Sequence, residues 1–178
     1  MKDRNRALSP VSFMFERVSL KVKSMEKIRV LFVCLGNICR SPMAEFVFRD
    51  MVEKAGLSHK IECASAAISR EEEGSPVHYG TRKKLAEVGI STEGKYAQVL
   101  RVEMRDQYDY ILGMDERNLK KLKERLGENS RAKIALLLDF TERKGEIADP
   151  WYTGDFDATY RDVFDGCKGL LSKIMEKN

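Results

Sequence analysis

Two reactive side chains, Cys34 and Arg40, are separated by five residues and could together bind and attack a phosphate group. A cysteine thiolate is a strong nucleophile, and the planar guanidinium of arginine can donate to two phosphate oxygens at once. The arginine would stabilise the charge that the phosphoryl oxygens carry in the transition state. With four cysteines and fifteen arginines in the chain, this spacing arises by chance about one time in three, so it needs a structural context.

The surrounding residues predict a strand, a tight loop and the start of a helix. The apolar run Ile28–Cys34 is typical of a buried strand. Gly36 permits close approach of the backbone, and Asn37 tolerates a left-handed conformation. Ser41 and Pro42 then open a predicted helix. A loop of this kind presents backbone N–H groups and the positive end of a helix dipole, which bind phosphate and stabilise a thiolate.

The hydroxyl of Ser41 could also donate to the sulfur of Cys34 and help the sulfur to leave in a second chemical step. The loop itself would hold the phosphate. The candidate binding residues in it are Leu35, Gly36, Asn37, Ile38, Cys39 and Ser41.

Residues 34–45, Cys-Leu-Gly-Asn-Ile-Cys-Arg-Ser-Pro-Met-Ala-Glu, resemble the signature of the low-molecular-weight protein tyrosine phosphatases. Residues 149–152, Asp-Pro-Trp-Tyr, resemble the second signature of that family, which carries the general acid. The resemblance runs from about Lys27 to the C-terminus and includes the spacing between the motifs. It implies hydrolysis of protein tyrosine phosphate and of aryl phosphate monoesters through a cysteinyl-phosphate, without a metal or other cofactor.

Asp149 is the preferred general acid. Asp-Pro in isolation predicts only a turn, but hydrolysis of a phosphate monoester needs a proton for the departing oxygen, and a carboxylic acid can supply it. The same group would then deprotonate the attacking water. Trp151 and Tyr152 follow directly, and both their clustering and the resemblance predict aromatic walls for a flat phenyl ring.

The resemblance assigns supporting roles to further residues. Cys39 is expected near Cys34, and in the family this pair forms a reversible disulfide that protects the nucleophile from irreversible oxidation. Asp115 could cap a helix, and the family match also gives it a part in ordering the phosphate loop. Ser65 matches a position that hydrogen-bonds the loop asparagine. Many relatives have a histidine where this chain has Val88, a departure that bears on the hydrogen-bond network behind that asparagine.

Strands and helices alternate along the chain, which favours a parallel sheet covered on both faces. The predicted strands are Ile28–Cys34, Ile61–Ala67, Tyr108–Gly113 and Lys133–Leu138. The predicted helices are Pro42–Ala55, Val77–Val88, Ala97–Arg105, Glu116–Arg125 and Phe156–Glu176. The family fold is a three-layer, doubly wound, four-stranded parallel sheet in the order 2-1-3-4. Ligands of such sheets bind at the carboxyl ends of strands, where Cys34 stands.

Charge is unevenly distributed. The net charge is +4; residues 1–27 hold seven Lys/Arg and three Asp/Glu, so the remainder, with 25 of each sign, is neutral. The domain therefore offers no argument for nucleic-acid binding, and no apolar run approaches membrane-spanning length. Residues 1–26 could be a flexible tail, an organelle signal or an upstream start before a domain over 27–178; we favour the tail or the upstream start.

The four cysteines and the lack of a secretory signal predict a reducing cytoplasm rather than disulfides, and we expect a monomer. The two histidines, His59 and His78, stand in no context typical of catalysis, and no zinc or iron ligand pattern is present. Three consecutive glutamates, Glu71–Glu73, occupy the family's variable substrate-edge loop. Beside the cleft they would favour basic peptides, although a solvated charge run explains them equally well.

Other functions share parts of this pattern. Family members that dephosphorylate arginine tend to carry Thr at the position of Ile38, and an apolar Ile38 suits an aromatic ring better than a charged guanidine. Arsenate reductase shares the Cys-x5-Arg loop but needs two further cysteines; residues 90–130 contain none, and Cys63 and Cys167 are placed wrongly. A non-catalytic phosphate-binding module would require loss of the nucleophile, the arginine or the acid, and all three are present.

Overall fold

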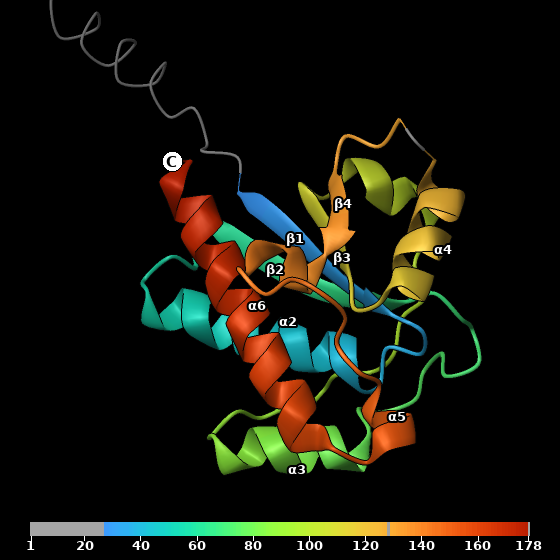
Figure 1. Cartoon of the computed structure of the whole chain (residues 1–178), viewed down its shortest axis with the longest axis vertical. Coiled ribbons are helices and arrows are strands. Elements are labelled where there is room, and N and C mark those ends of the chain that lie inside the picture. Colours follow the sequence, from blue (N-terminus) through green and yellow to red (C-terminus); the bar gives the residue numbers. More distant parts are fainter. Residues whose placement is uncertain (1–26, 128, 178) are drawn as a thin grey trace, which may run out of the picture.

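A four-stranded parallel sheet with the strand order β2-β1-β3-β4 forms the centre of the molecule (Figure 1). The computed structural model describes residues 27–127 and 129–177, so the prediction for residues 1–26 lies outside the described residues. The strands are β1 (Ile28–Cys34), β2 (Ile61–Ala67), β3 (Tyr110–Gly113) and β4 (Lys133–Leu136). The predicted parallel sheet and its order are confirmed.

Helices cover both faces of the sheet. They are α2 (Arg40–Lys54), α3 (Tyr79–Glu87), α4 (Glu116–Leu126), the one-turn α5 (Pro150–Thr153) and α6 (Phe156–Glu176), with two 3-10 helices, η1 (Val102–Asp106) and η2 (Leu137–Phe140). Figure 1 shows α2 and α6 packed on one face and α4 on the other. Three layers result, as expected for a doubly wound fold.

β1 has apolar side chains on both faces because both faces are covered. Val30 and Phe32 belong to the core between the sheet and the helices α2 and α6. Leu31 and Val33 belong to the smaller core beneath α4. All four side chains are at most 1 % exposed, and burying each contributes about 1.5–3 kcal/mol relative to exposure. This burial fixes the register of the strand that ends at Cys34.

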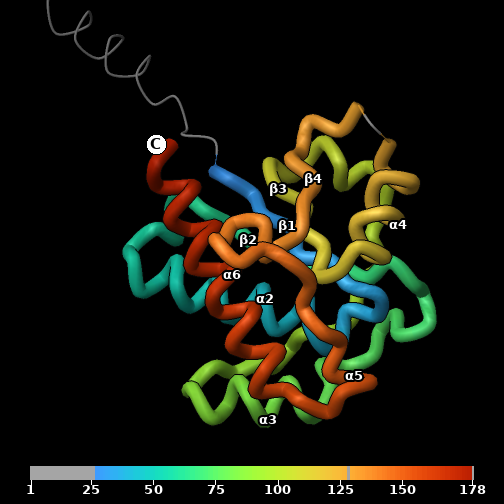
Figure 2. The backbone as a smooth tube through the Cα atoms, viewed as in Figure 1, coloured from blue at the N-terminus to red at the C-terminus, as the bar shows by residue number. Residues whose placement is uncertain are grey.

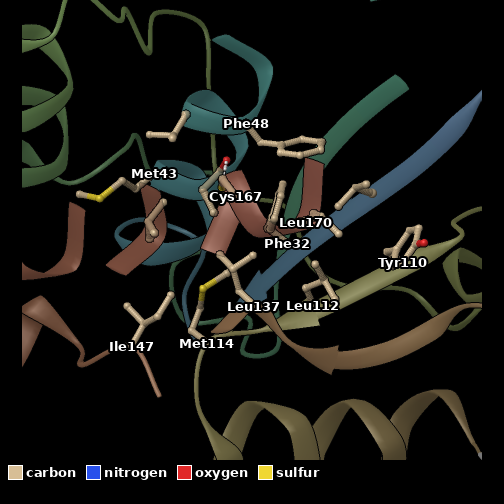
Figure 3. Close-up of a cluster of buried hydrophobic side chains, with 14 of the residues drawn as sticks. Phe32, Met43, Phe48, Tyr110, Leu112, Met114, Leu137, Ile147, Cys167 and Leu170 are labelled. Atoms are coloured by element: carbon tan, nitrogen blue, oxygen red, sulfur yellow. Dashed lines mark hydrogen bonds between the residues drawn. The ribbon is translucent and has the colours of Figure 1, made fainter. Parts of the chain in front are cut away.

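The larger core holds the helix that follows the phosphate loop. The ring of Phe32 meets that of Phe48 on α2 edge to face, with centroids 5.6 Å apart. Cys167 and Leu170 of α6 lie beside them (Figure 3), and both are fully buried. Helix α2 is thus clamped between the sheet and α6, so the end of the loop that it carries is fixed in place.

The helix predicted for Ala97–Arg105 is wrong over most of its length. The chain there is extended: Leu100 N–H donates to the carbonyl of Ala67 at 2.8 Å, and Ala67 N–H donates to Gln98 at 2.6 Å. Only the later residues turn, as η1. The apolar spacing of this segment fitted a helix, but its backbone groups pair with the end of β2 instead of with each other.

Other element boundaries differ by a few residues. The predicted fourth strand ends early because the Asp139 side chain accepts from the N–H of Leu136 at 3.0 Å and turns the chain into η2. The third strand begins at Tyr110 rather than two residues earlier. Helix α2 starts at Arg40, so Pro42 lies within its first turn rather than at its first position.

Two segments that are far apart in sequence meet at the carboxyl end of the sheet. One is the loop between β1 and α2, and the other is the chain that leads into α5. Figure 2 shows the latter returning to the N-terminal end of α2, where Arg40 and Asp149 are hydrogen-bonded. This meeting creates the candidate site.

Candidate active site

The loop from Cys34 to Ser41 wraps around the buried amide of Asn37. Asn37 is fully buried and adopts a left-handed conformation, with φ of 57°, as its residue type permits. Its Nδ2 donates to the hydroxyls of Ser41 and Ser65, both at 2.8 Å, and its Oδ1 accepts from the N–H of Gln98 at 3.0 Å. The contact expected for Ser65 is present. Gln98 was not anticipated, because its segment was predicted as helix.

Cys34 ends β1, and its sulfur is surrounded by donors. The N–H of Asn37 donates to Sγ at 3.3 Å, and the hydroxyl oxygen of Ser41 lies 3.1 Å from it. Because Ser41 already accepts from the Asn37 amide, its own proton is free to point at the sulfur. Both contacts would stabilise a thiolate. The predicted contact between the Ser41 hydroxyl and the Cys34 sulfur is present.

Arg40 opens α2 with a side chain that is only 3 % exposed. One terminal nitrogen donates to Asp115 at 2.6 Å and to the carbonyl of Ile147 at 3.1 Å, and the other donates to Asp149 at 2.6 Å. Burial alone would lower the pKa of Arg40, but the charges of Cys34 and of the two aspartates raise it above its ordinary value. Arg40 is therefore a permanent cation.

The fork of Arg40 is already engaged by carboxylates, which the sequence did not predict. Its Nε, by contrast, is the one buried side-chain nitrogen or oxygen without a partner in the described residues. A buried donor without a partner is costly, and an oxygen of a bound anion would satisfy it. Asp115 thus orients the guanidinium, and Nε remains available to donate to a ligand.

The two aspartates hold Arg40 from different elements. Asp115 is the N-cap of α4 and accepts from the N–H of Asn118 at 2.7 Å, so its predicted cap is present, and it also contacts Arg40. Asp149 is the N-cap of α5 and accepts from the N–H of Trp151 at 3.1 Å. Pro150, at the first position of α5, fixes the turn that presents Asp149 to the guanidinium.

A cavity of about 170 Å³ opens in front of these groups. It is lined by Cys34, Leu35, Gly36, Ile38, Cys39, Arg40, Glu71, Glu72, Asp149, Trp151 and Tyr152. The predicted binding residues Asn37 and Ser41 do not line the cavity, and the Asn37 side chain hydrogen-bonds to Ser41 and Ser65. Asp115 does not line it either and contacts Arg40 from the start of α4. Trp151 and Tyr152 are 58 % and 78 % exposed, so the aromatic surface forms the outer rim, whereas the buried Cys34 and Arg40 form the floor.

His78, which the sequence did not single out, supports that rim. Its ring stacks on Phe156 with centroids 5.3 Å apart and meets Trp151 edge to face at 5.7 Å. Its backbone N–H donates to Ile38 of the phosphate loop at 2.8 Å, and its Nδ1 accepts from the N–H of Gly80 and caps α3. Only its position before a helix could have signalled it.

Val88, where many relatives have a histidine, does not interrupt the network behind Asn37. Val88 lies at the C-terminal end of α3 and is 40 % exposed, so its side chain does not face Asn37. The hydrogen bonds of the Asn37 amide are complete without it. The phosphate loop therefore has its supporting network.

All four cysteines are free thiols. Burial, reinforced by the charge of Cys34, raises the pKa of Cys39 to about 12. Burial likewise raises the pKa of Cys63 to about 12 and that of Cys167 well above its ordinary value. The latter two donate to carbonyls of α2 and do not line the cavity, so they are not placed to act on a ligand bound there.

Metal-binding clusters and membrane-spanning helices are both absent from residues 27–127 and 129–177. No group of three or more His, Cys, Asp or Glu side chains in these residues is arranged to hold a metal ion. No helix in the same residues is long and apolar enough to cross a membrane.

A thiol at the end of a strand, a loop that leads into a helix, a buried arginine and a carboxyl group lining the same cavity are the parts that a cysteine-dependent phosphatase requires. The model of the family described as low molecular weight phosphotyrosine protein phosphatase matches residues 29–178. The chain belongs to this family.

Curated proteins and solved structures that are similar to the chain include other phosphatases. The low molecular weight protein-tyrosine-phosphatase YfkJ of Bacillus subtilis is 42 % identical over 152 residues, which cover 84 % of this chain and 97 % of that protein. The structural alignment with its crystal structure covers 86 % of this chain and 98 % of the chain in that crystal structure, with a TM-score of 0.82. A Drosophila arginine phosphatase is 28 % identical and covers 83 % of this chain and 98 % of its own, with a TM-score of 0.76.

Proposed function

We propose that this protein tyrosine phosphatase uses Cys34 as its nucleophile, Arg40 as its phosphate ligand and Asp149 as its acid and base. The single observation that supports this assignment best is that all three line one cavity whose rim is aromatic. The proposed substrate is phosphotyrosine in a protein, with aryl phosphate monoesters as small analogues.

The first step begins when a phosphate group enters the loop. Backbone N–H groups and the free Nε of Arg40 would donate to its oxygens. The nitrogen that holds Asp149 would exchange that carboxylate for a phosphate oxygen, while Asp115 keeps the guanidinium in orientation. Asp149, in its protonated form, is then free to face the ester oxygen.

Chemistry follows in two steps. The sulfur of Cys34 attacks phosphorus, the bond to the tyrosyl oxygen breaks, and Asp149 gives that oxygen its proton. A water molecule then attacks the cysteinyl-phosphate, Asp149 takes the proton from the water, and the sulfur leaves as a thiolate. The Ser41 hydroxyl, 3.1 Å from the sulfur, would stabilise the departing thiolate.

The rim supports tyrosine over other phosphorylated residues. A phenyl ring long enough to reach the floor of the cavity would lie against Trp151 and Tyr152, and the apolar Ile38 would contact its edge. Serine phosphate is too short to use these walls. A protein-arginine substrate would place a polar guanidine against Ile38, which loses hydrogen bonds to water without replacing them.

The proposed setting is a reducing cytoplasm, in which the protein acts as a monomer. The free state of all four cysteines is consistent with such a setting.

The test is hydrolysis of matched phosphotyrosine, phosphoserine and phosphoarginine peptides in the presence of a metal chelator. We expect rapid release of phosphate from the phosphotyrosine peptide alone. A preference for phosphoarginine would replace tyrosine as the substrate, and loss of activity in chelator would contradict the metal-free mechanism.

A further inference from the structure

A second charged cluster lies behind the phosphate loop and outside the cavity. Glu45 of α2 and Lys95, in the segment between α3 and η1, have side chains that are only 5 % and 9 % exposed. Nζ of Lys95 lies 2.8 Å from Oε2 of Glu45. In the described residues, no other ion pair has both side chains less than a tenth exposed.

Hydrogen bonds connect this pair to the sulfur of the nucleophile. The hydroxyl of Ser65 donates to Oε2 of Glu45 at 2.5 Å and accepts from the Asn37 side chain at 2.8 Å. The backbone N–H of Asn37 then donates to Cys34. Lys95 also donates to the carbonyl of Ser65 at 3.2 Å. Lys95 therefore binds both the Glu45 side chain, which orients the Ser65 hydroxyl, and the backbone carbonyl of Ser65.

Without a counter-charge, the carboxylate of Glu45 would weaken the binding of anions in the phosphate loop. A buried carboxylate behind a loop that must hold a thiolate and a phosphate dianion repels both, and the low dielectric of the interior strengthens the repulsion. Arg49 also contacts Glu45, but its side chain is half exposed, so water screens its charge. The buried counter-charge is Lys95.

We propose that Lys95 is a positioning residue for catalysis: it neutralises Glu45 and fixes Ser65, and thereby keeps Asn37 aimed at the sulfur of Cys34. It touches neither the substrate nor the reacting atoms. This inference rests on the proposed function of the loop, and its test includes a reaction of Cys34 that needs no phosphatase turnover.

The test compares Lys95→Met with the double variant Glu45→Gln/Lys95→Met. Two rates are measured: carboxymethylation of Cys34 by iodoacetate, an anion of the kind that the loop attracts, and turnover of p-nitrophenyl phosphate. In Lys95→Met both rates should fall about tenfold or more, because an uncompensated charge displaces the donors at the sulfur. In the double variant the charge is gone and the amide that replaces the carboxylate still accepts from Ser65, so both rates should return to within about threefold of wild type.

Lys84→Met is the matched control. Lys84 pairs with Glu87 and Asp157 between α3 and α6, and its side chain is 18 % exposed. Its loss removes two ion pairs, more exposed than that of Lys95, that have no hydrogen bond to the loop. We expect lower thermal stability with an unchanged rate of carboxymethylation. A general loss of stability therefore cannot imitate the effect expected at Lys95.

The proposal is overturned if Lys95→Met is carboxymethylated at the wild-type rate, or if the double variant is as slow as the single one. If Lys95→Met does not fold, the double variant decides: rates within about threefold of wild type support the proposal, and a loss of about tenfold or more overturns it. A wild-type protein that is carboxymethylated at Cys34 but hydrolyses no phosphate ester would contradict the proposed function, while the carboxymethylation rates would still decide the role of Lys95.

Discussion

At the scale of single residues, Arg40 is the centre of the site, and its three side-chain nitrogens differ in their hydrogen-bond partners. Two of them bind Asp115 and Asp149, and the third is buried without a partner. The sequence identified the arginine and both carboxyl groups but could not predict that they bind each other, since they are distant in the chain and meet only in the fold. If Arg40 binds phosphate as proposed, we expect substrate binding to be coupled to release of Asp149 through this one guanidinium.

Replacement of Asp149 by alanine tests its role as the acid. Turnover of aryl phosphates with poor leaving groups should fall by about 10²–10⁴-fold, because no proton reaches the departing oxygen. Esters of very acidic phenols should be affected less, since they leave without a proton. Turnover is measured across a series of leaving groups. Equal losses across the series would mean that Asp149 only holds Arg40 and caps α5.

Cys39 provides a prediction about pH. Peroxide should oxidise Cys34 to a sulfenic acid, whose sulfur the Cys39 thiolate then attacks, so that the S–S bond forms and hydroxide leaves. Burial, together with the charge of Cys34, raises the pKa of Cys39 to about 12. Its thiolate is therefore scarce at neutral pH and increases about tenfold per pH unit below that value.

Disulfide formation after a peroxide pulse should therefore accelerate from pH 7 to pH 10, as followed by alkylation and peptide mass analysis. In Cys39→Ser, activity lost to peroxide should return poorly after treatment with a thiol reductant. A rate of closure that does not depend on pH, or a link from Cys34 to Cys63 or Cys167, would show that Cys39 is not the resolving thiol.

At the scale of elements, local patterns predicted well where burial and local chemistry agree. The bounds of β1 and β2 match the prediction because their apolar residues face closed layers. The segment 97–105 was misjudged because its apolar spacing fits a helix, whereas its backbone pairs with Ala67 and Asn37 across the fold. The support behind the phosphate loop was partly missed for the same reason: these contacts are long-range.

The contact between α3 and the start of α6 carries a prediction about the aromatic rim. A Cβ at Gly80 would overlap the ring of Phe156, which stacks on His78. Alanine favours a helix by about 1 kcal/mol over glycine, but the clash costs about 1–3 kcal/mol. We expect Gly80→Ala to be slightly less stable than wild type. The displaced Phe156 should shift His78, which contacts Trp151, and so make the Trp151 ring more mobile.

The kinetic consequence should be confined to the substrate ring. For Gly80→Ala, KM for a phosphotyrosine peptide should rise several-fold while inhibition by inorganic phosphate stays unchanged. Lys83→Ala, an exposed position on the same helix, is the control and should alter neither quantity. Weaker inhibition by phosphate in Gly80→Ala would place the damage in the phosphate loop rather than at the rim.

At the scale of the whole molecule, charge is graded across the cavity. The floor holds Arg40, and the edge holds the carboxylates of Glu71 and Glu72. A substrate is thus met by positive charge at its phosphate and by negative charge beside it. Glu73 differs from its neighbours, because it pairs with Arg70 and does not line the cavity.

This gradient predicts a preference for phosphotyrosine flanked by lysine over phosphotyrosine flanked by glutamate. Glu71→Gln/Glu72→Gln should reduce the ratio of the two kcat/KM values by about threefold, the size expected of exposed charge pairs. Added salt should reduce it as well. Glu73→Gln should leave the ratio unchanged. If the double variant keeps the wild-type ratio at low salt, Glu71 and Glu72 do not affect the choice of substrate and are only solvated charges.

The covalent intermediate tests the central claim most directly. After an acid quench during turnover of a phosphotyrosine peptide, peptide mass spectrometry should find phosphate on Cys34, and Cys34→Ser should lose turnover while still binding inorganic phosphate. Turnover in Cys34→Ser at the wild-type rate, or phosphate attached to another residue, would contradict the assignment of Cys34 as the nucleophile.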